Sequence, residues 1–171
     1  ILRKGTNTNY TFGVGGGTDN ASYRFSLGYQ NLNGIIKESG LKRYTANLNS
    51  NFKMLDGLVG IDALVIASQT SEDIAPISTN AGFTGNLVGQ ALQWNPTVPL
   101  VGADGRFVTD ANNPTNVSIG NTTINPLHLL AAHSEVAKTT NTLANISPYV
   151  NITDNLVYRY RLGINYGVGV T

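Results

Sequence analysis

Apolar and polar residues alternate one for one along several long stretches of this 171-residue chain. In the stretch 21–30, for example, single polar or small residues separate Tyr23, Phe25 and Leu27. Successive side chains of a β-strand point to opposite faces, so a period of two predicts strands with one apolar and one polar face. The pattern predicts six strands, over residues 9–16, 21–30, 43–54, 58–68, 142–152 and 156–170.

The charged residues of these six stretches all fall on the polar face. The candidate site residues on that face are Arg24, Arg43, Asn47, Asn49, Lys53, Asp62, Arg159 and Arg161. The apolar face carries Tyr23, Phe25, Leu27, Tyr29, Tyr44, Leu48, Phe52, Tyr158, Tyr160, Leu162, Ile164 and Tyr166. A charge on the lipid face of a membrane barrel costs about 2–4 kcal/mol at the midplane, but a soluble sandwich also keeps charges off its core face. The alternation by itself is compatible with both.

The length of the last stretch separates these two folds. Residues 156–170 form an alternating run of 15 residues, whereas an ordinary strand has about 5–6. Such a run extends about 50 Å. Tilted by about 45°, it rises about 35 Å, which is enough to cross a hydrocarbon core of about 30 Å.

The connections between the expected strands alternate in length. Residues 17–20, 55–57 and 153–155 have the composition of tight turns, whereas residues 31–41 and 69–141 form long connections. Alternation of short and long connections is typical of an up-and-down membrane barrel, which has short periplasmic turns and longer extracellular loops. The chain is therefore predicted to be all-β, as part of a transmembrane antiparallel β-barrel with one long extracellular loop over about residues 69–141.

Several classes of function are disfavoured by composition. The formal charge is only +1 and the sequence has no basic stripe, which argues against binding of nucleic acid. The chain has no Cys, which excludes disulfides and Cys nucleophiles. His128 and His133 lack a third ligand at a metal-site spacing, and residues 13–17 lack the Lys of a phosphate loop. No cofactor, metal or catalytic group is predicted, so we expect a protein that is not an enzyme.

Short motifs in the first third of the chain resemble the SusC/RagA group of TonB-linked (TonB-dependent) outer-membrane transporters. They are Gly16-Gly17-Thr18, Ser26-Leu27-Gly28-Tyr29, Gly34-Ile35-Ile36, Arg43-Tyr44 and Leu55-Asp56-Gly57. The resemblance resumes at Asp104-Gly105-Arg106-Phe107 and Asn125-Pro126-Leu127. Transporters of this group have about 22 strands, a plug domain and a TonB box. About six strands without the last two parts predict a fragment of the early barrel, since six strands cannot close.

The resemblance implies import of oligosaccharides or peptides across the outer membrane of a Gram-negative bacterium. It implies three partners: a SusD-like surface lipoprotein, TonB acting through the missing N-terminal region, and outer-membrane lipid. The polar-face residues would then line the lumen, and the apolar-face residues would contact lipid. Trp94, Asp104, Arg106 and Phe107 of the long loop would meet the lipoprotein or the substrate.

Alternatives remain open at the level of the sequence. A soluble β-sandwich adhesin or carbohydrate-binding module would pack the Tyr-rich face inward. A non-energised porin would lack plug and TonB box, and an outer-membrane hydrolase would need a nucleophile and base near one rim. Trp94 has its own alternative role, as a residue of a small core inside the loop.

Overall fold

A computed structural model describes residues 1–77, 85–115, 117–120, 122–153 and 155–171. The chain divides into two compact units. The sheet unit comprises Thr6–Leu32, Leu41–Glu72 and Ala137–Thr171. The loop unit comprises Ile1–Gly5, Asn33–Gly40 and Asp73–Val136.

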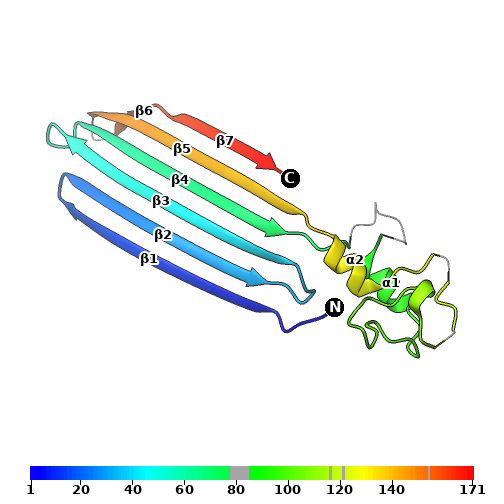
Figure 1. The fold of residues 1–171 in the computed structure, drawn as a ribbon. Coiled ribbons are helices and arrows are strands. Elements are labelled where there is room, and N and C mark those ends of the chain that lie inside the picture. The colour runs from blue at the N-terminus through cyan, green and yellow to red at the C-terminus, as the bar shows by residue number, and fades with distance from the viewer. Residues whose placement is uncertain (78–84, 116, 121, 154) are drawn as a thin grey trace. The chain divides into compact units, whose positions relative to one another are not determined.

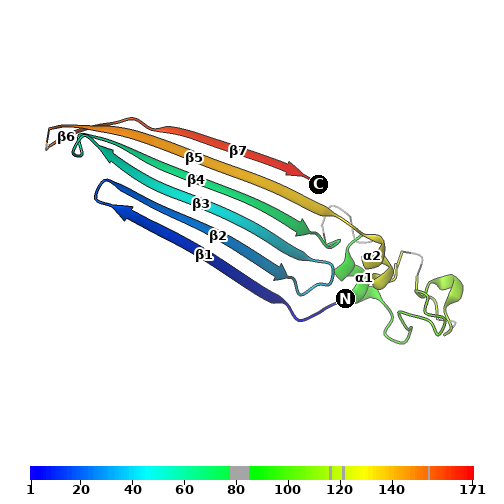
Figure 2. The same cartoon turned by 60° about the vertical axis from the view of Figure 1, so that its left-hand side comes forward.

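A seven-stranded antiparallel sheet dominates the fold. Its strands follow one another in chain order, with β6 and β7 both paired to β5 (Figures 1 and 2). The strands are β1 (Thr6–Thr18), β2 (Ala21–Asn33), β3 (Gly40–Met54), β4 (Val59–Asp73), β5 (Val136–Thr153), β6 (Leu156–Arg159) and β7 (Leu162–Val170). The prediction of an all-β fold is confirmed, and the described sheet is open.

Short connections join β1 to β2, β3 to β4 and β5 to β6, all at one end of the sheet, which we call the turn end. The opposite end, from which the chain leaves through residues 34–39 and 74–135, is the loop end. The turn after β3 uses three consecutive residues with positive φ, at Leu55 (53°), Asp56 (52°) and Gly57 (89°). Such left-handed conformations suit a tight hairpin, and Gly at the last position adopts one without steric cost.

The stretch 156–170, expected as one strand, is divided into β6 and β7 at Tyr160 and Arg161. The register is the same on both sides of the interruption, where Tyr149 lies opposite Arg159 and Ile146 opposite Leu162, and it shifts only near the turn, between Asn151 and Thr153. Tyr160 lies opposite Pro148 and donates its N–H to the Pro148 carbonyl at 2.9 Å. Pro148 has no N–H to donate in return, so the ladder loses one bond at the interruption.

Within the sheet unit, the described residues form strands and turns only, so this unit has no second layer of its own. Large apolar side chains stay open to solvent, for example Phe12 at 65% and Ile164 at 69% exposure. A soluble monomer seldom exposes such a contiguous apolar face.

The loop unit has a small core of its own. Val98, Val108 and Ile119 are buried together, with Trp94 packed against them. Two short helices, α1 (Leu87–Gln93) and α2 (Pro126–Ala132), contact each other, and a single 3₁₀ turn, η2 (Asp110–Asn112), lies between them in sequence. Asn86 and Asn125 cap the two helices by accepting backbone N–H groups of the first turn.

Side-chain amides of buried residues, and not a sheet ladder, bond the irregular backbone of the loop unit. Gln90, fully buried, accepts the Ile124 N–H at 2.6 Å and donates to the Thr122 carbonyl at 3.3 Å. Asn125 donates to the carbonyls of Leu100 and Val108. Each such bond satisfies a backbone group of the irregular loop that has no partner strand. None of the described helices is long and apolar enough to cross a membrane.

Two leucines of α1 provide a matched test of this loop core. Leu87 is fully buried, whereas Leu92 is 82% exposed. Leu87→Ala should lower the free energy of opening of the loop unit by about 2–5 kcal/mol, because it leaves a cavity. Leu92→Ala should change it by less than about 0.5 kcal/mol. Hydrogen exchange of amides in 85–135 measures the difference, and equal protection in both variants would show that α1 does not pack as described.

Candidate functional site

Polar side chains of one sheet face bond across neighbouring strands. Asn47 of β3 donates to the Ser26 hydroxyl of β2 at 3.2 Å, and Arg43 donates to Thr70 of β4 at 3.2 Å. Gln30 likewise bonds Asn7 of β1 at 3.4 Å. The face predicted to be polar therefore carries hydrogen bonds between neighbouring strands from β1 to β4, and it is suited to contact with water or with polar groups of another segment.

The polar face carries an ionic cluster at its turn end. Asp62 of β4 accepts a short hydrogen bond from the Asn51 amide of β3. Its second carboxylate oxygen lies 3.0 Å from the Arg159 guanidinium of β6. Both charged side chains are partly exposed, at 36% for Asp62 and 41% for Arg159. The cluster thus joins residues 97 positions apart in the chain and spans β3, β4 and β6.

Tyr149 of β5 connects this cluster to the sheet beneath. The Arg159 guanidinium lies 4.9 Å from the centroid of the Tyr149 ring, within the range of a cation–π contact. Tyr149 is only 9% exposed because its ring lies over Gly60 of β4. A Cβ at Gly60 would come within 2.2 Å of the ring, so any larger residue there would displace the Tyr149 side chain.

Four of the remaining polar-face residues predicted from the sequence make no side-chain bond to this cluster. Arg24, Asn49, Lys53 and Arg161 are exposed, and within the described ranges no hydrogen bond or ion pair joins their side chains to other residues. Gly60 and Tyr149 were not among the predicted site residues. The parity of Tyr149, opposite to that of Val150, placed it on the polar face, but nothing local indicated that it would lie on Gly60.

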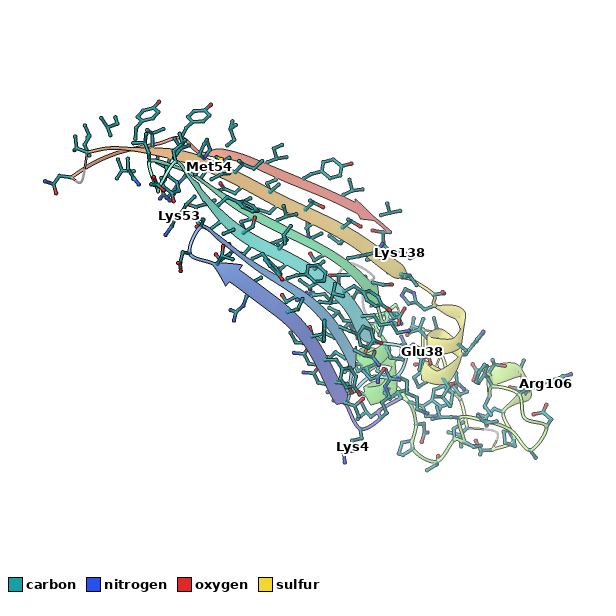
Figure 3. The ribbon with its side chains drawn as sticks, turned by 90° about the vertical axis from the view of Figure 1, so that its left-hand side faces the viewer. Lys4, Glu38, Lys53, Met54, Arg106 and Lys138 are labelled. Atoms are coloured by element: carbon teal, nitrogen blue, oxygen red, sulfur yellow. The ribbon has the colours of Figure 1, made fainter. Side chains whose placement is uncertain are left out.

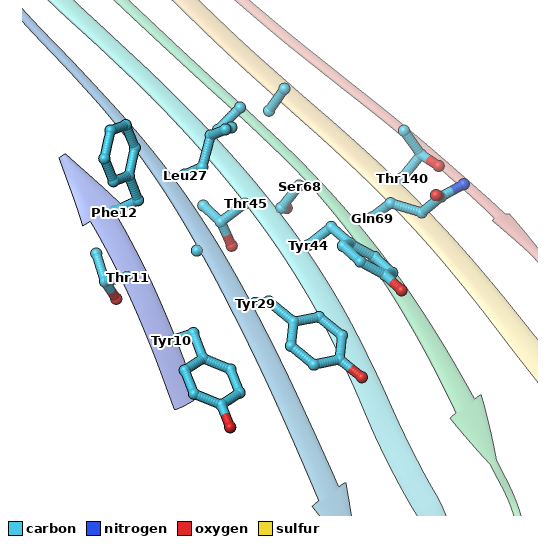
Figure 4. A pocket seen from close by; sticks show the side chains of 13 residues that line it. Tyr10, Thr11, Phe12, Leu27, Tyr29, Tyr44, Thr45, Ser68, Gln69 and Thr140 are labelled. Atoms are coloured by element: carbon cyan, nitrogen blue, oxygen red, sulfur yellow. The ribbon is translucent and has the colours of Figure 1, made fainter. Parts of the chain in front are cut away.

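The apolar face carries a row of tyrosines near the loop end. The rings of Tyr10 and Tyr29 stack at 6.5 Å with 7° between their planes, and those of Tyr29 and Tyr44 lie 5.1 Å apart at 39°. Beside this row is an open groove of about 700 Å³, which Figure 4 shows crossing from β1 to β5. Its lining includes Phe12, Leu27, Ala46, Ala67, Gln69 and Thr140.

Further aromatic side chains of the apolar face lie toward the turn end. Tyr23 is near the start of β2, Phe52 near the end of β3, and Tyr158 in β6. All three are about half exposed or more. Phe25, Leu48, Leu162, Ile164 and Tyr166 have the same parity on their strands. Tyr160 lies at the interruption between β6 and β7.

The loop residues predicted as contacts occupy different surroundings. Trp94 packs against the loop core and donates its indole N–H to the Val98 carbonyl at 2.9 Å. Asp104 and Arg106 form an exposed turn, with 3.8 Å between their charged groups. Phe107 stacks on His128 at 5.5 Å. In the parts of the chain that the structure describes, no three His, Asp or Glu side chains come together as a metal site would need.

Comparison with known proteins relates the chain to TonB-dependent receptors. It is 32% identical over 109 residues to "TonB-dependent receptor SusC" of Bacteroides thetaiotaomicron, which covers 58% of this chain. It is 23% identical over 168 residues to "TonB-dependent receptor P3" of Formosa agariphila, which covers 96% of this chain. The matched residues span 9% and 16% of these two relatives. No family model matches the chain.

The close approach of Tyr149 to Gly60 predicts strong coupling between the two positions. Gly60→Ala should lower the free energy of unfolding by about 1–3 kcal/mol, because the new methyl group displaces the ring. In a Tyr149→Ala background the same substitution should cost less, with a coupling energy of about 0.5–3 kcal/mol. Gly163→Ala is the matched control, since a Cβ there meets no atom within 4 Å. Thermal unfolding of the four variants measures the cycle, and simple additivity would contradict the contact.

Proposed function

We propose that these residues form part of the wall of a TonB-dependent outer-membrane transporter. The observation that carries the proposal is the single-layer sheet, in which one face is apolar and exposed while the other is polar and hydrogen-bonded. A membrane barrel needs this division, because lipid covers its outside and water or protein fills its inside. The similarity to two TonB-dependent receptors supports the same conclusion.

The polarity of the two faces assigns each a role in this proposal. The face of Arg24, Arg43, Asp62 and Arg159 lines the lumen, together with Asn47, Asn49, Lys53 and Arg161. The Asp62–Arg159 pair lies at its turn end, where it is available to polar groups of a plug. The face of Tyr23, Tyr29 and Tyr44 contacts lipid.

The two aromatic sets on the apolar face support a membrane band between them. Tyr44 and Phe52 are eight residues apart on β3, which is about 27 Å along the strand. At a tilt of 35–45° this separation is about 20 Å across the membrane, close to the band of about 25 Å between the aromatic girdles of known barrels. The turn end then faces the periplasm, and the loop end faces the outside.

The open sheet requires further strands in this proposal. β1 at one edge and β6 and β7 at the other each leave backbone N–H and C=O groups without a neighbouring strand. Unpaired groups cannot face hydrocarbon, so the strands must belong to a larger closed barrel. The plug domain and TonB box that would couple such a barrel to TonB are proposed to lie in other parts of the protein.

The loop unit is the proposed contact region for an extracellular partner. Its exposed turn at Asp104 and Arg106 and an open pocket of about 400 Å³ beside Phe107 and His133 offer both polar and apolar contacts. Such a mixture suits a SusD-like lipoprotein and an oligosaccharide or peptide substrate. The packing of Trp94 into the loop core supports a positioning role for that residue.

Uptake by cells expressing the full-length protein tests the function. We expect growth on the imported nutrient to be lost when TonB is deleted or the proton gradient is dissipated. Uptake that continues without TonB would indicate a non-energised porin. A full-length protein that is soluble without detergent would indicate a soluble sandwich domain instead.

Adjacent residues of β3 test which face meets lipid. Leu48→Arg should abolish or strongly reduce assembly in the outer membrane, because an Arg at the midplane costs about 2–4 kcal/mol. Asn49→Arg, one residue further and on the other face, should assemble normally. Heat-modifiable migration on gels and the amount of protein in outer-membrane fractions measure the outcome. Equal assembly of both variants would contradict the assigned orientation.

A further inference from the structure

Two lysines break the rule that charges lie on the polar face. β3 and β5 both begin earlier than the alternation predicted, so they include Lys42 and Lys138. Lys42 has the parity of Tyr44, and Lys138 has the parity of Ala144, which places both lysines on the apolar face. Both are exposed, and both lie near the loop end of the sheet, as Figure 3 shows for Lys138.

The strand register brings the two lysines to the same level of the sheet. The Arg43–Thr70 and Asn51–Asp62 bonds align β3 with β4 so that Lys42 lies opposite Ser71. The backbone bond from Asn151 to Leu58 aligns β4 with β5 so that Lys138 also lies opposite Ser71. The lysines thus flank Ser71 from the two neighbouring strands, about 10 Å apart at their backbones. Long flexible side chains at that separation can reach a single anion.

Neither lysine has an acidic partner. No hydrogen bond or ion pair joins the side chain of Lys42 or Lys138 to any other residue in the described part of the chain. The nearest acid by position on this face is Asp73, the last residue of β4 and a member of the loop unit. At a lipid surface, two such cations attract an anionic headgroup by about 1 kcal/mol each.

The apolar groove begins directly below this lysine pair. In the same register, Tyr44, Gln69 and Thr140 form the next level, followed by Ala46 and Ala67. The two alanines give the groove a low floor, while Tyr29 and Leu27 form one wall (Figure 4). A trough of about 700 Å³ on a sheet face has the shape for a hydrocarbon chain lying on the protein.

We propose that Lys42, Lys138 and this groove bind a phosphate-bearing lipid of the outer leaflet. The lysines hold the phosphate, and the groove holds an acyl chain. Two cations beyond a tyrosine row, with apolar surface below, match an amphiphile that has an anionic head and a hydrocarbon tail. An uncharged partner protein would leave both lysines unpaired. The inference rests on the proposed membrane function, because it requires the Tyr-rich face to meet lipid.

Lipid binding by the full-length protein in detergent provides the test. The probes are lipid A carrying its phosphates and the same lipid after dephosphorylation, with retention measured by native mass spectrometry. The protein should retain the phosphorylated form. Lys42→Gln/Lys138→Gln should bind it about ten-fold or more weakly, because each Lys near an anionic lipid surface contributes about five-fold. Ala67→Phe, which fills the groove, should also weaken binding.

Controls separate this site from general charge and from misfolding. Lys53→Gln removes a lysine from the opposite face at the turn end and should leave lipid retention unchanged. Heat-modifiable migration should be normal in every variant. Equal retention by the double-lysine variant, or equal binding of dephosphorylated lipid A, would overturn the lipid site while leaving the transporter proposal intact. A full-length protein that never enters the outer membrane would overturn both.

Discussion

The backbone ladder between neighbouring strands is the interaction on which the rest of the sheet unit depends. In that unit no second layer packs on the sheet, so few side chains are buried and hydrophobic burial contributes little. Each interior strand instead satisfies its N–H and C=O groups on both sides. The interruption at Tyr160 illustrates the dependence, since it occurs where Pro148 removes a single donor. In hydrocarbon such pairing becomes obligatory, because no water is present to replace a missing bond.

The two faces of the sheet perform different tasks because their environments differ. On the polar face, Asn51, Asp62, Arg159 and Tyr149 tie β3, β4, β5 and β6 together at the turn end. Individually such contacts contribute little when exposed, but they strengthen where neighbouring protein excludes water. The apolar face relies on stacked tyrosines and on its surroundings. In the proposed barrel, a plug would cover the first face and lipid the second.

Features of this structure that depend on residues close in sequence could be predicted, and those that depend on residues far apart in sequence could not. Local alternation predicts six strands and puts Tyr44 and Asp62 on opposite faces, and the described strands overlap the predicted stretches. The placement of Lys42 and Lys138 on the apolar face was not predicted, because the predicted strands begin at residues 43 and 142, after these lysines, whereas β3 and β5 begin before them. The pairing of Tyr149 with Gly60 was also missed, since 89 residues separate them and nothing near either residue reports the other. The sequence is compatible with Trp94 as a residue that contacts a partner or as a residue of a loop core. Its packing against Val98 and Val108 shows that it belongs to the loop core.

By itself, the sequence determined which side chains share a face, because the period of two is a local property of the extended backbone. It also determined that the charges within the alternating stretches share one face and that the connections alternate in length. The tertiary structure alone decided the register, through hydrogen bonds between residues far apart in the chain. Register placed Arg159 beside Asp62, and it set Lys42 and Lys138 on either side of Ser71 above an apolar groove. A pattern within one strand cannot report its alignment with the next, because alignment depends on both strands together.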